Sequence, residues 1–439
     1  MRFLRLLVAR YICALLVCST VLVLLYSSIH WEVKVREDPE MGQLFRNIQK
    51  LQDDIQEQNH ESSRLLHLLE QMRRFNASTK LERTDANTSS LSDISHIPPI
   101  AVLVFACNRP IATRVHLNRL LELRPSKDLF PVVVSQDCNH EGTASVIRSY
   151  GSQITFLQQP NQTEPNLTKK MKKFAGYYKI ARHYRWALDQ VLDVMGFKVA
   201  IVTEDDLMLA NDFFEYFSAT YKLLLLDATL YCVSAWNDNG KLGLIEDNPE
   251  LLYRTDFFPG KPRRLGWMLT KELWHELSPK WPTGFWDDWI RSPEQRLNRA
   301  CIRPEISRTA MSSYGKVGVS RGLFYEKHLK SIVLNSRFVP FTTLDLSYLL
   351  KDKYDKQFLG KVKAARQVTW AEYSSNSSRF DSPVRVLYDG EQELARIAKQ
   401  IGFMEDVKAG VPRTAYKGVV TIFFRGTRTY FAPKNWEKQ

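Results

Sequence analysis

Three consecutive acidic residues, Glu204, Asp205 and Asp206, follow an apolar run that predicts a β-strand. Residues 199–202 of that run show no polar alternation, which is typical of a strand buried on both faces of a sheet. Ligands bind beyond the carboxyl ends of such strands. Because adjacent carboxylates repel each other unless a cation or hydrogen bonds offset their charge, we expect Asp205 or Asp206 to hold a divalent metal. Oxygen ligands favour Mn²⁺ or Mg²⁺ over zinc.

Two more polar residues stand at the carboxyl ends of predicted strands. Arg109 follows a strand predicted over 100–106, and Asp137 follows one predicted over 130–135. At the ligand edge of an α/β sheet, an arginine suits phosphate and an aspartate suits a base or ribose. The sequence contains neither a G-x-G-x-x-G after the first strand nor a P-loop. A metal that bridges a diphosphate would replace such a glycine cradle.

A second constellation is Trp286-Asp287-Asp288-Trp289. Indole faces stack on sugars, and a carboxylate beside them could accept a hydroxyl proton. The structural alternative is a helix start, in which the aspartates complement the backbone dipole and the tryptophans pack in the core. His183 also has two interpretations. It is either a donor to a phosphate or uracil group or a packing residue, since no second histidine stands at metal-ligand spacing.

Strand-like and helix-like segments alternate through the middle of the chain. Residues 139–150 predict a helix, 154–157 a third strand, and 172–194 a long amphipathic helix ahead of the acidic triplet. This alternation predicts an α/β fold with a mainly parallel sheet flanked by helices.

The amino-terminal end predicts a membrane anchor. Residues 11–29 carry no charge over 19 positions, and three arginines precede them. We therefore expect a cytosolic tail over 1–10, a transmembrane signal anchor over 11–29 and a lumenal remainder that begins with a polar stem over 30–97. A short helical stripe in the stem adds the hypothesis of homo- or hetero-association through the span and stem.

Cysteine usage and composition agree with a lumenal protein. Outside the predicted span remain Cys107, Cys138, Cys232 and Cys301, which predict two disulfides in an oxidising compartment with three connectivities open. At 439 residues, 44% hydrophobic and 25% charged, the chain is neither disordered nor polytopic in composition. The net charge of +13 is scattered and does not indicate a nucleic-acid partner.

Seven sequence blocks stand in a fixed order along the chain. They are FACNRP (105–110), SQDC (135–138), EDDL (204–207), DFFEYF (212–217), YRTDFFPG (253–260), WDDW (286–289) and RPEISRT (303–309). From about residue 98 to the end, the chain resembles the N-acetylglucosaminyltransferase I family, the α-1,3-mannosyl-glycoprotein 2-β-N-acetylglucosaminyltransferases. The resemblance implies a GT-A nucleotide-diphospho-sugar transferase fold over 98–312, a linker and donor loop over 313–326, and a smaller C-terminal α+β domain over 327–439.

The resemblance also implies an activity. Members transfer GlcNAc from UDP-GlcNAc, with inversion and in β1,2 linkage, to the α1,3-arm mannose of Man5GlcNAc2 N-glycans on glycoproteins, which starts hybrid and complex N-glycan synthesis. They are single-pass type II proteins of the Golgi membrane. Carried over by position, Asp287 is the catalytic base and Asp206 binds Mn²⁺. The resemblance also pairs Cys107 with Cys138 and Cys232 with Cys301. The residues that it assigns to the UDP-sugar are Arg109, Asp137, His183, Asp205 and Ser320.

Two alternatives follow from the same residues. The insertion Lys261-Pro262-Arg263-Arg264 interrupts a family run beside the expected acceptor side, which favours a catalytically inactive Golgi sugar-binding protein. The intact acids at 204–206 and 287 favour an enzyme instead. The other alternative is an O-mannose-type β1,2-GlcNAc transferase, and the short polar stem argues against the lectin-like stem domain that such an enzyme carries.

Overall fold

The computed structural model describes residues 97–259, 266–316, 323–375 and 380–438, together with Gln43 and Asn47. The chain divides into two compact units, Met1–Ser90 and Leu91–Gln439, and the fold described below belongs to the second. The predicted anchor, nearly all of the predicted stem, the 261–264 insertion and Ser320 lie outside the described residues. Among the helices that are described, none is long and apolar enough to cross a membrane.

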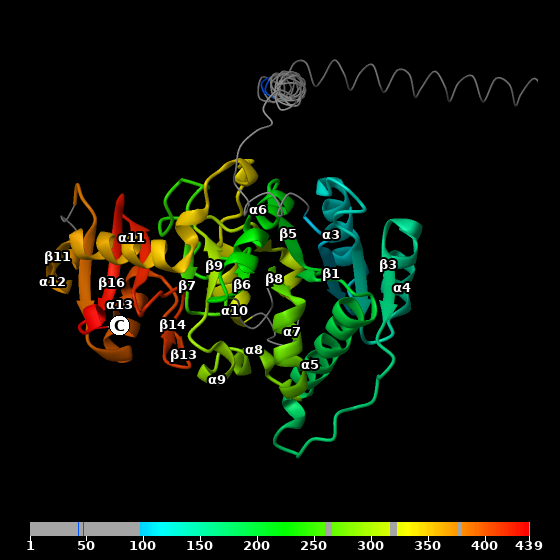
Figure 1. Cartoon of the computed structure of the whole chain (residues 1–439). Helices are drawn as coiled ribbons and strands as arrows, with labels where there is room; N and C mark the ends of the chain where they lie inside the picture. Colours follow the sequence, from blue (N-terminus) through cyan, green and yellow to red (C-terminus); the bar gives the residue numbers. More distant parts are fainter. Residues whose placement is uncertain are drawn as a thin grey trace, which may run out of the picture. The chain divides into compact units, whose positions relative to one another are not determined.

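An eight-stranded sheet forms the centre of the second unit (Figure 1). Its strand order is β3-β2-β1-β4-β8-β6-β9-β7. The first four strands of this order are mutually parallel, β6 is parallel to β9, and β7 and β8 are antiparallel to their neighbours. The strands are β1 (Ala101–Ala106), β2 (Val132–Gln136), β3 (Thr155–Gln158), β4 (Val199–Glu204), β6 (Leu230–Ser234), β7 (Leu252–Thr255), β8 (Trp267–Thr270) and β9 (Ala300–Pro304).

The parallel half of this sheet is the half that the sequence predicts. Each of the four predicted strands is present, with its ends moved by one or two residues, and β1 and β2 are buried along their whole length. The antiparallel strands β7 and β8 differ from the prediction of a mainly parallel sheet. Their pairing joins segments far apart in the sequence, and local periodicity carries no information about such pairs.

Helices cover both faces of the main sheet. Because successive strand residues point to opposite faces, Val102 and Val104 pack under α3, α4 and α6, whereas Ala101 and Leu103 pack under α5 and α7. The helix predicted over 172–194 is divided into a 3₁₀ turn η3 (Lys172–Phe174), α5 and a π-helical turn η4 (Asp189–Val194). The covering helices are α3 (Pro110–Leu123), α4 (Glu141–Arg148), α5 (Ala175–Leu188), α6 (Phe213–Leu226) and α7 (Lys271–Leu277).

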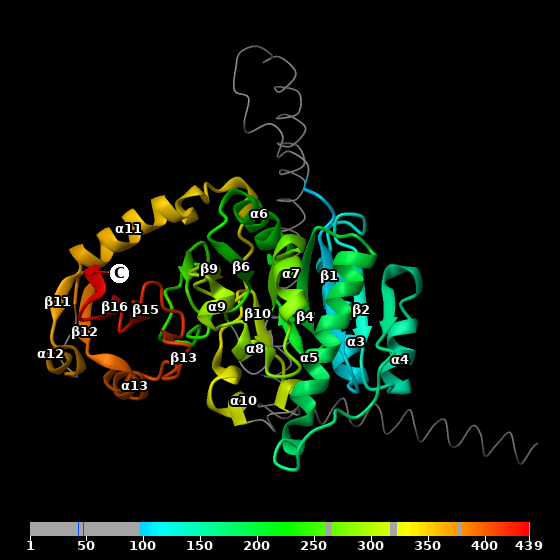
Figure 2. The same ribbon diagram turned by 60° about the horizontal axis from the view of Figure 1, so that its bottom comes forward.

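A four-stranded sheet, in the order β11-β12-β16-β15, forms the carboxyl-terminal part of the unit (Figure 2). Three helices surround it, and a two-stranded ribbon, β13–β14, connects α13 to β15 along the chain. The elements are α11 (Lys351–Ala364), β11 (Arg366–Val368), α12 (Trp370–Ser374), β12 (Val384–Tyr388), α13 (Gly390–Ile401), β13 (Val407–Lys408), β14 (Val411–Pro412), β15 (Val420–Phe424) and β16 (Thr427–Pro433).

Short elements make the connections. The strands β5 (Leu207–Leu209) and β10 (Thr309–Met311) pair as an antiparallel ribbon directly after the acidic triplet. The helices are α8 (Trp286–Trp289), α9 (Pro293–Arg296) and α10 (Leu323–Lys327). The 3₁₀ turns are η2 (Gly151–Gln153), η5 (Ser278–Lys280), η6 (Ser313–Lys316), η7 (Leu329–Ser331), η8 (Phe341–Thr343), η9 (Ser347–Leu349) and η10 (Trp436–Lys438).

A buried ion pair beneath the main sheet gives a test of the fold. Arg308 donates to Asp212 Oδ2 from Nε at 3.1 Å and from Nη2 at 3.0 Å, and both side chains are 0% exposed. We expect Asp212→Ala to lower the free energy of unfolding by about 3–5 kcal/mol, because it leaves a buried guanidinium without its counter-ion. Urea denaturation measures this. Asp389→Ala, which breaks an exposed pair with Lys434, is the control and should leave the midpoint unchanged. Equal midpoints for both variants would contradict the prediction.

Candidate functional site

The carboxyl ends of β1, β2 and β4 meet at one edge of the main sheet. In the parallel register, Phe105 lies opposite Glu204, and Ala106 lies opposite Gln136. The polar residues that follow these three strands therefore share this edge, which we call the acidic edge.

Two disulfides are present in the described part of the chain. Cys107 pairs with Cys138, and Cys232 pairs with Cys301, so the connectivity that the family resemblance implies is confirmed. The first joins the loop after β1 to the loop after β2, at the acidic edge. The second joins β6 to β9 within the main sheet.

Arg109 lies between the two carboxylates that follow β4. Its Nη1 donates to Asp206 Oδ2 at 2.5 Å, and its Nη2 donates to Asp205 Oδ1. Both carboxylate side chains are 0% exposed, whereas the Arg109 side chain is 24% exposed. Thr113 Oγ1 adds a hydrogen bond of 3.0 Å to Asp205 Oδ2. The guanidinium thus offsets the repulsion between two carboxylates that have lost their contact with water.

The balance of charge at the acidic edge shows in the pKa values. Burial raises the pKa of Asp205 to about 7; Arg109 opposes this shift and Asp206 adds to it. Burial acts to lower the pKa of Arg109, but the neighbouring carboxylates outweigh it and raise that pKa above its ordinary value. One guanidinium is therefore not enough to return Asp205 to an ordinary pKa, and a further cation would stabilise the ionised carboxylates.

Asp137 and His183 are each held in place by one polar neighbour. Asp137 Oδ1 accepts a hydrogen bond of 3.0 Å from Gln162 Nε2. The Nε2 atom of His183 lies 2.7 Å from Ser135 Oγ, and its ring meets the Phe105 ring edge-on with 4.8 Å between centroids. Because Ser135 and Phe105 lie near the carboxyl ends of β2 and β1, both predicted donor-binding residues stand at the acidic edge.

An aromatic chain links this edge to α8. The Tyr184 ring stacks on Phe105 with 3.6 Å between centroids, and its hydroxyl donates to Glu204 Oε1 at 3.1 Å. The Trp286 ring lies 5.0 Å from the Tyr184 ring and is fully buried. Trp286 therefore presents no face to a sugar, so the stacking role that the sequence suggested for it is wrong and the core interpretation is right.

Asp287 stands beside that buried indole, with its own side chain 12% exposed. It belongs to the single turn of α8, which follows Phe285 in the left-handed region at φ 53°. Arg291 Nη1 donates to the backbone oxygen of Asp287 at 2.6 Å and lies 3.5 Å from Asp287 Oδ2. The neighbouring Asp288 side chain is 42% exposed. A buried tryptophan and a buried arginine thus hold a nearly buried carboxylate on a one-turn helix.

The donor set of the acidic edge fits a hard divalent cation. Carboxylate oxygens are the ligands that Mn²⁺ and Mg²⁺ prefer. Across the described ranges, no group of three or more His, Cys, Asp or Glu residues is arranged to hold a metal by itself. An ion held by Asp206 would therefore complete its coordination with substrate phosphates and water, as Mg²⁺ does when only one or two carboxylates bind it.

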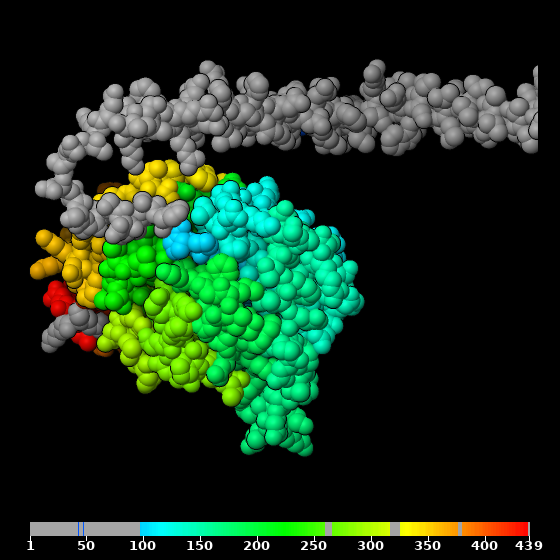
Figure 3. Space-filling model, turned by 45° about the vertical axis from the view of Figure 1, so that its right-hand side comes forward, coloured from blue at the N-terminus to red at the C-terminus, as the bar shows by residue number. Residues whose placement is uncertain are grey.

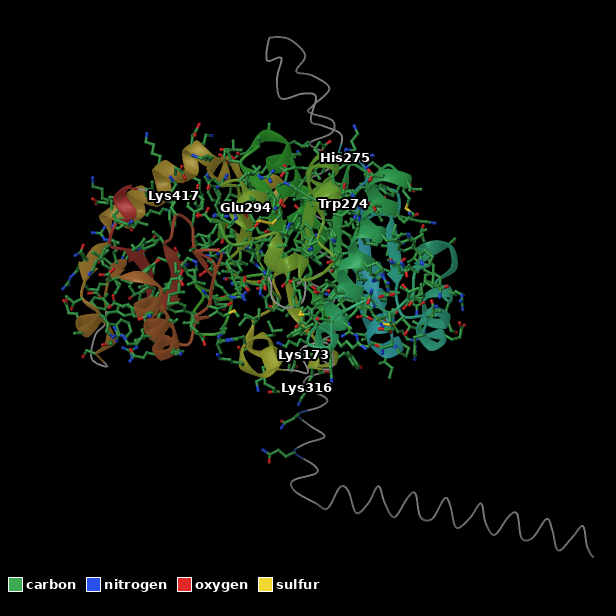
Figure 4. All side chains as sticks on the ribbon, turned by 90° about the horizontal axis from the view of Figure 1, so that it is seen from below. Lys173, Trp274, His275, Glu294, Lys316 and Lys417 are labelled. Carbon is green, nitrogen blue, oxygen red and sulfur yellow. A yellow bond between two sulfur atoms is a disulfide. The ribbon has the colours of Figure 1, made fainter. Side chains whose placement is uncertain are left out.

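Two segments of the unit can be located in the figures. Gln162 belongs to the segment between β3 and α5, which projects from the body of the unit (Figure 3). Lys316, at the end of η6, lies on the opposite side of the unit from His275 of α7 (Figure 4).

Two cavities in the described part of the chain lie away from the acidic edge. One of about 800 Å³ lies between β7 and α11, and one of about 640 Å³ lies beside the start of α13. Neither is lined by a residue of the acidic edge. The charged cluster, rather than cavity size, therefore identifies the site.

Most of the predicted site residues come together here. The residues that hold them were not predicted from the sequence, and only Thr113 carried a signal there, since it stands one helical turn after Arg109. Ser320 lies outside the described residues, so its role stays a prediction. The overlooked residues are Thr113, Ser135 and Gln162.

Comparisons with known proteins agree on one family. A profile of the GNT-I family matches residues 12–439. A protein of Arabidopsis thaliana named alpha-1,3-mannosyl-glycoprotein 2-beta-N-acetylglucosaminyltransferase is 40% identical over 344 residues, which are 78% of this chain and 76% of that protein.

Two solved glycosyltransferase-like structures show weaker similarity. A mannosyltransferase of Pyrobaculum calidifontis, in complex with GDP-Man and Mn²⁺, is 17% identical with a TM-score of 0.32; the match covers 53% of this chain and 61% of that one. S. aureus TarS 1-349, in complex with UDP, is 12% identical with a TM-score of 0.35, over 63% and 77% of the two chains. Likeness at this level carries no argument about this chain.

The charge balance around Arg109 predicts a pH-dependent defect. In EDTA, we expect Arg109→Met to lower the free energy of unfolding by about 3 kcal/mol at pH 8 and by much less at pH 5. The reason is that burial raises the pKa of Asp205 and Arg109 opposes this shift, so loss of the guanidinium raises the pKa of Asp205 further in the folded variant. A group with a raised folded pKa binds more protons when folded than when unfolded, so its contribution to stability falls as pH rises toward that pKa.

Chemical denaturation at both pH values measures this effect. Arg148→Met, which removes an exposed pair with Glu141, is the matched control and should show no pH-dependent difference from wild type. A loss of equal size at pH 5 and pH 8 in Arg109→Met would contradict the assigned role of Arg109.

Proposed function

Because the chain belongs to the GNT-I family, we propose that it transfers GlcNAc from UDP-GlcNAc to the α1,3-linked mannose of a Man5GlcNAc2 N-glycan. The linkage formed is β1,2, and the main sheet with its covering helices is a GT-A fold. The observation that carries the proposal is one arrangement of charge. Two buried aspartates pair with Arg109, and the adjacent Glu204 is connected, through Tyr184 and Trp286, to the helical turn that carries a further, nearly buried carboxylate, Asp287.

The donor binds at the acidic edge in this proposal. Arg109 faces the diphosphate, while Asp137 and His183 take hydrogen bonds to the nucleoside. Gln162 and Ser135 keep these two side chains in place before substrate arrives, which lowers the ordering cost of binding. Ser320 is proposed as a further donor contact on the strength of the resemblance.

Asp206 holds the metal, with Asp205 beside it to bind the UDP-sugar. When bound, Mn²⁺ would neutralise negative charge that develops on the departing diphosphate. The protein's own part is to hold both carboxylates in a fixed orientation, which Arg109 and Thr113 do through their hydrogen bonds to them. Burial of this pair keeps its field strong where the charge develops.

Asp287 acts as the general base. Its carboxylate accepts the proton of the mannose 2-hydroxyl while that oxygen forms a bond to the anomeric carbon of GlcNAc. The bond from that carbon to the diphosphate breaks as UDP leaves from the opposite side, so the configuration inverts. The base must lie within hydrogen-bond reach of the hydroxyl, and the 12% exposure of the Asp287 side chain supports this role.

We also propose a Golgi location with the catalytic part in the lumen. The uncharged stretch 11–29 supports a single span, and the two disulfides support an oxidising compartment. Partners in this setting are UDP-GlcNAc, glycoprotein N-glycans and the Golgi membrane.

A comparison of substitutions at two neighbouring aspartates tests the role of Asp287 as the general base. For the full chain in detergent with Mn²⁺, we expect Asp287→Asn to lower kcat for transfer to Man5GlcNAc2 by about 10² to 10⁴-fold, because the hydroxyl proton loses its acceptor. Asp288→Asn, a change of the same kind one residue away, should cost less than about tenfold. Radiolabelled GlcNAc transfer measures both, and wild-type activity in Asp287→Asn would remove Asp287 as the base.

Removal of the metal and a change of acceptor complete the test. EDTA or Asp206→Ala should abolish transfer, because the diphosphate then departs with its charge unscreened. An O-mannosyl peptide offered in place of Man5GlcNAc2 distinguishes the O-mannose alternative. A folded wild-type chain that binds UDP-GlcNAc but transfers to neither acceptor would identify the inactive sugar-binding alternative.

A further inference from the structure

We propose that the carboxyl-terminal part of the chain positions the Asp287 carboxylate for catalysis. The segment 404–417, which contains β13 and β14, would do so through two intermediate side chains, Phe257 and Arg291. The inference rests on the proposed function, because it gives these positioning residues a role only if Asp287 is the base.

The first step is the set of hydrogen bonds by which Arg291 fixes α8. A helix of one turn has little stability of its own, so outside contacts must fix its direction. Arg291 is 2% exposed on its side chain; besides its 2.6 Å bond to the Asp287 backbone oxygen, its Nε donates to the backbone oxygen of Phe258 at 3.0 Å. One guanidinium thus ties the turn that carries Asp287 to the chain that follows β7.

The second step is a shared aromatic ring. The guanidinium carbons of Arg291 and Arg413 each lie 4.9 Å from the centroid of Phe257. The ring is 1% exposed and belongs to the hydrophobic core of the four-stranded sheet. Cation–π contacts are stronger when they are shielded from water, so the position of this ring contributes to the position of Arg291.

The third step anchors Arg413. Its Nε and Nη2 donate to the two carboxylate oxygens of Asp406 at 2.7 and 2.9 Å, and its Nη1 donates to Asp238 Oδ1 at 2.5 Å. Asp238 follows β6 of the main sheet, whereas Arg413 and Asp406 belong to the carboxyl-terminal part. Arg413 and Asp238 are almost fully buried, and the bidentate pair with the partly exposed Asp406 has a narrow geometry, so Arg413 connects the position of segment 404–417 to the main sheet.

Backbone hydrogen bonds reinforce the same junction. Asp256 N donates to the Ala415 oxygen at 2.8 Å, and Lys417 N donates to Asp256 Oδ2 at 2.6 Å. Lys417 is labelled on the carboxyl-terminal ribbon in Figure 4. Segment 404–417 therefore fixes Asp256, the residue before Phe257, and the donor-side residues are held instead by Thr113, Ser135 and Gln162. The polar contacts that hold the donor-side residues thus do not involve segment 404–417.

This separation predicts a split in kinetic constants. In the full chain, Phe257→Leu removes the shared ring but leaves every ion pair in place. We expect kcat for transfer to Man5GlcNAc2 to fall by about tenfold to a hundredfold, because a small misplacement of a reacting group costs that much. The KM for UDP-GlcNAc and the Kd for UDP should stay within about twofold of wild type, since a misplaced base leaves donor binding intact.

Phe431→Leu is the matched control. Phe431 is a fully buried ring of the same core, and its ring neighbours are Tyr373 and Phe403. We expect it to lower Tm as much as Phe257→Leu does while kcat stays at the wild-type level. Arg291→Lys gives an independent variant that keeps the buried charge but shortens the reach to α8, and kcat should fall in it as well.

The outcomes separate two kinds of failure. A wild-type chain without transfer, or an active Asp287→Asn variant, would overturn the proposed function itself. If wild type transfers and Asp287→Asn does not, full kcat in both Phe257→Leu and Arg291→Lys would overturn the positioning role alone. Equal kcat losses in Phe257→Leu and Phe431→Leu, or a loss of UDP affinity parallel to kcat, would also overturn it, because both indicate general destabilisation.

Discussion

The contact on which the site depends is that of Arg109 with two carboxylates that have no access to water. Asp205 and Asp206 stand next to each other, each with a fully buried side chain, and the folded chain could not hold both ionised without a cation between them. This requirement ties the loop after β1 to the end of β4. The parallel register of these strands and the Cys107–Cys138 disulfide serve the same end, because they bring the arginine to the acids.

The catalytic arrangement that we propose divides between the two sheets. The main sheet supplies the donor side through the carboxyl ends of β1, β2 and β4, where short polar contacts hold each side chain. The acceptor side is built on α8, a single turn whose direction comes from Trp286 on one side and Arg291 on the other. The Arg291 guanidinium in turn lies over the ring of Phe257, which belongs to the hydrophobic core of the four-stranded sheet. In the proposed mechanism, the carboxyl-terminal part of the chain thereby helps to position the base.

The two interpretations of the WDDW block, core packing and a chemical role, apply to different residues of the block. Trp286 is a core residue, packed against Tyr184 and without an exposed face. Asp287, the next residue, reaches the surface while its backbone stays bonded to a buried arginine. The stacking chain from Phe105 through Tyr184 to Trp286 connects the turn that carries this carboxylate to the acidic edge.

The sequence by itself determined the strands of the parallel half, the shared edge of Arg109, Asp137 and the acids, and, through family resemblance, both disulfides. These follow from the local hydrophobic pattern and from residue order, neither of which depends on how the side chains pack. Only the tertiary structure decided that Arg109 bridges both aspartates, that Trp286 is buried, that β7 and β8 run antiparallel, and that Arg291 and Arg413 share the Phe257 ring. Each of these is a contact between residues distant along the chain or a matter of burial, and such contacts depend on how separate elements pack, which no local pattern encodes.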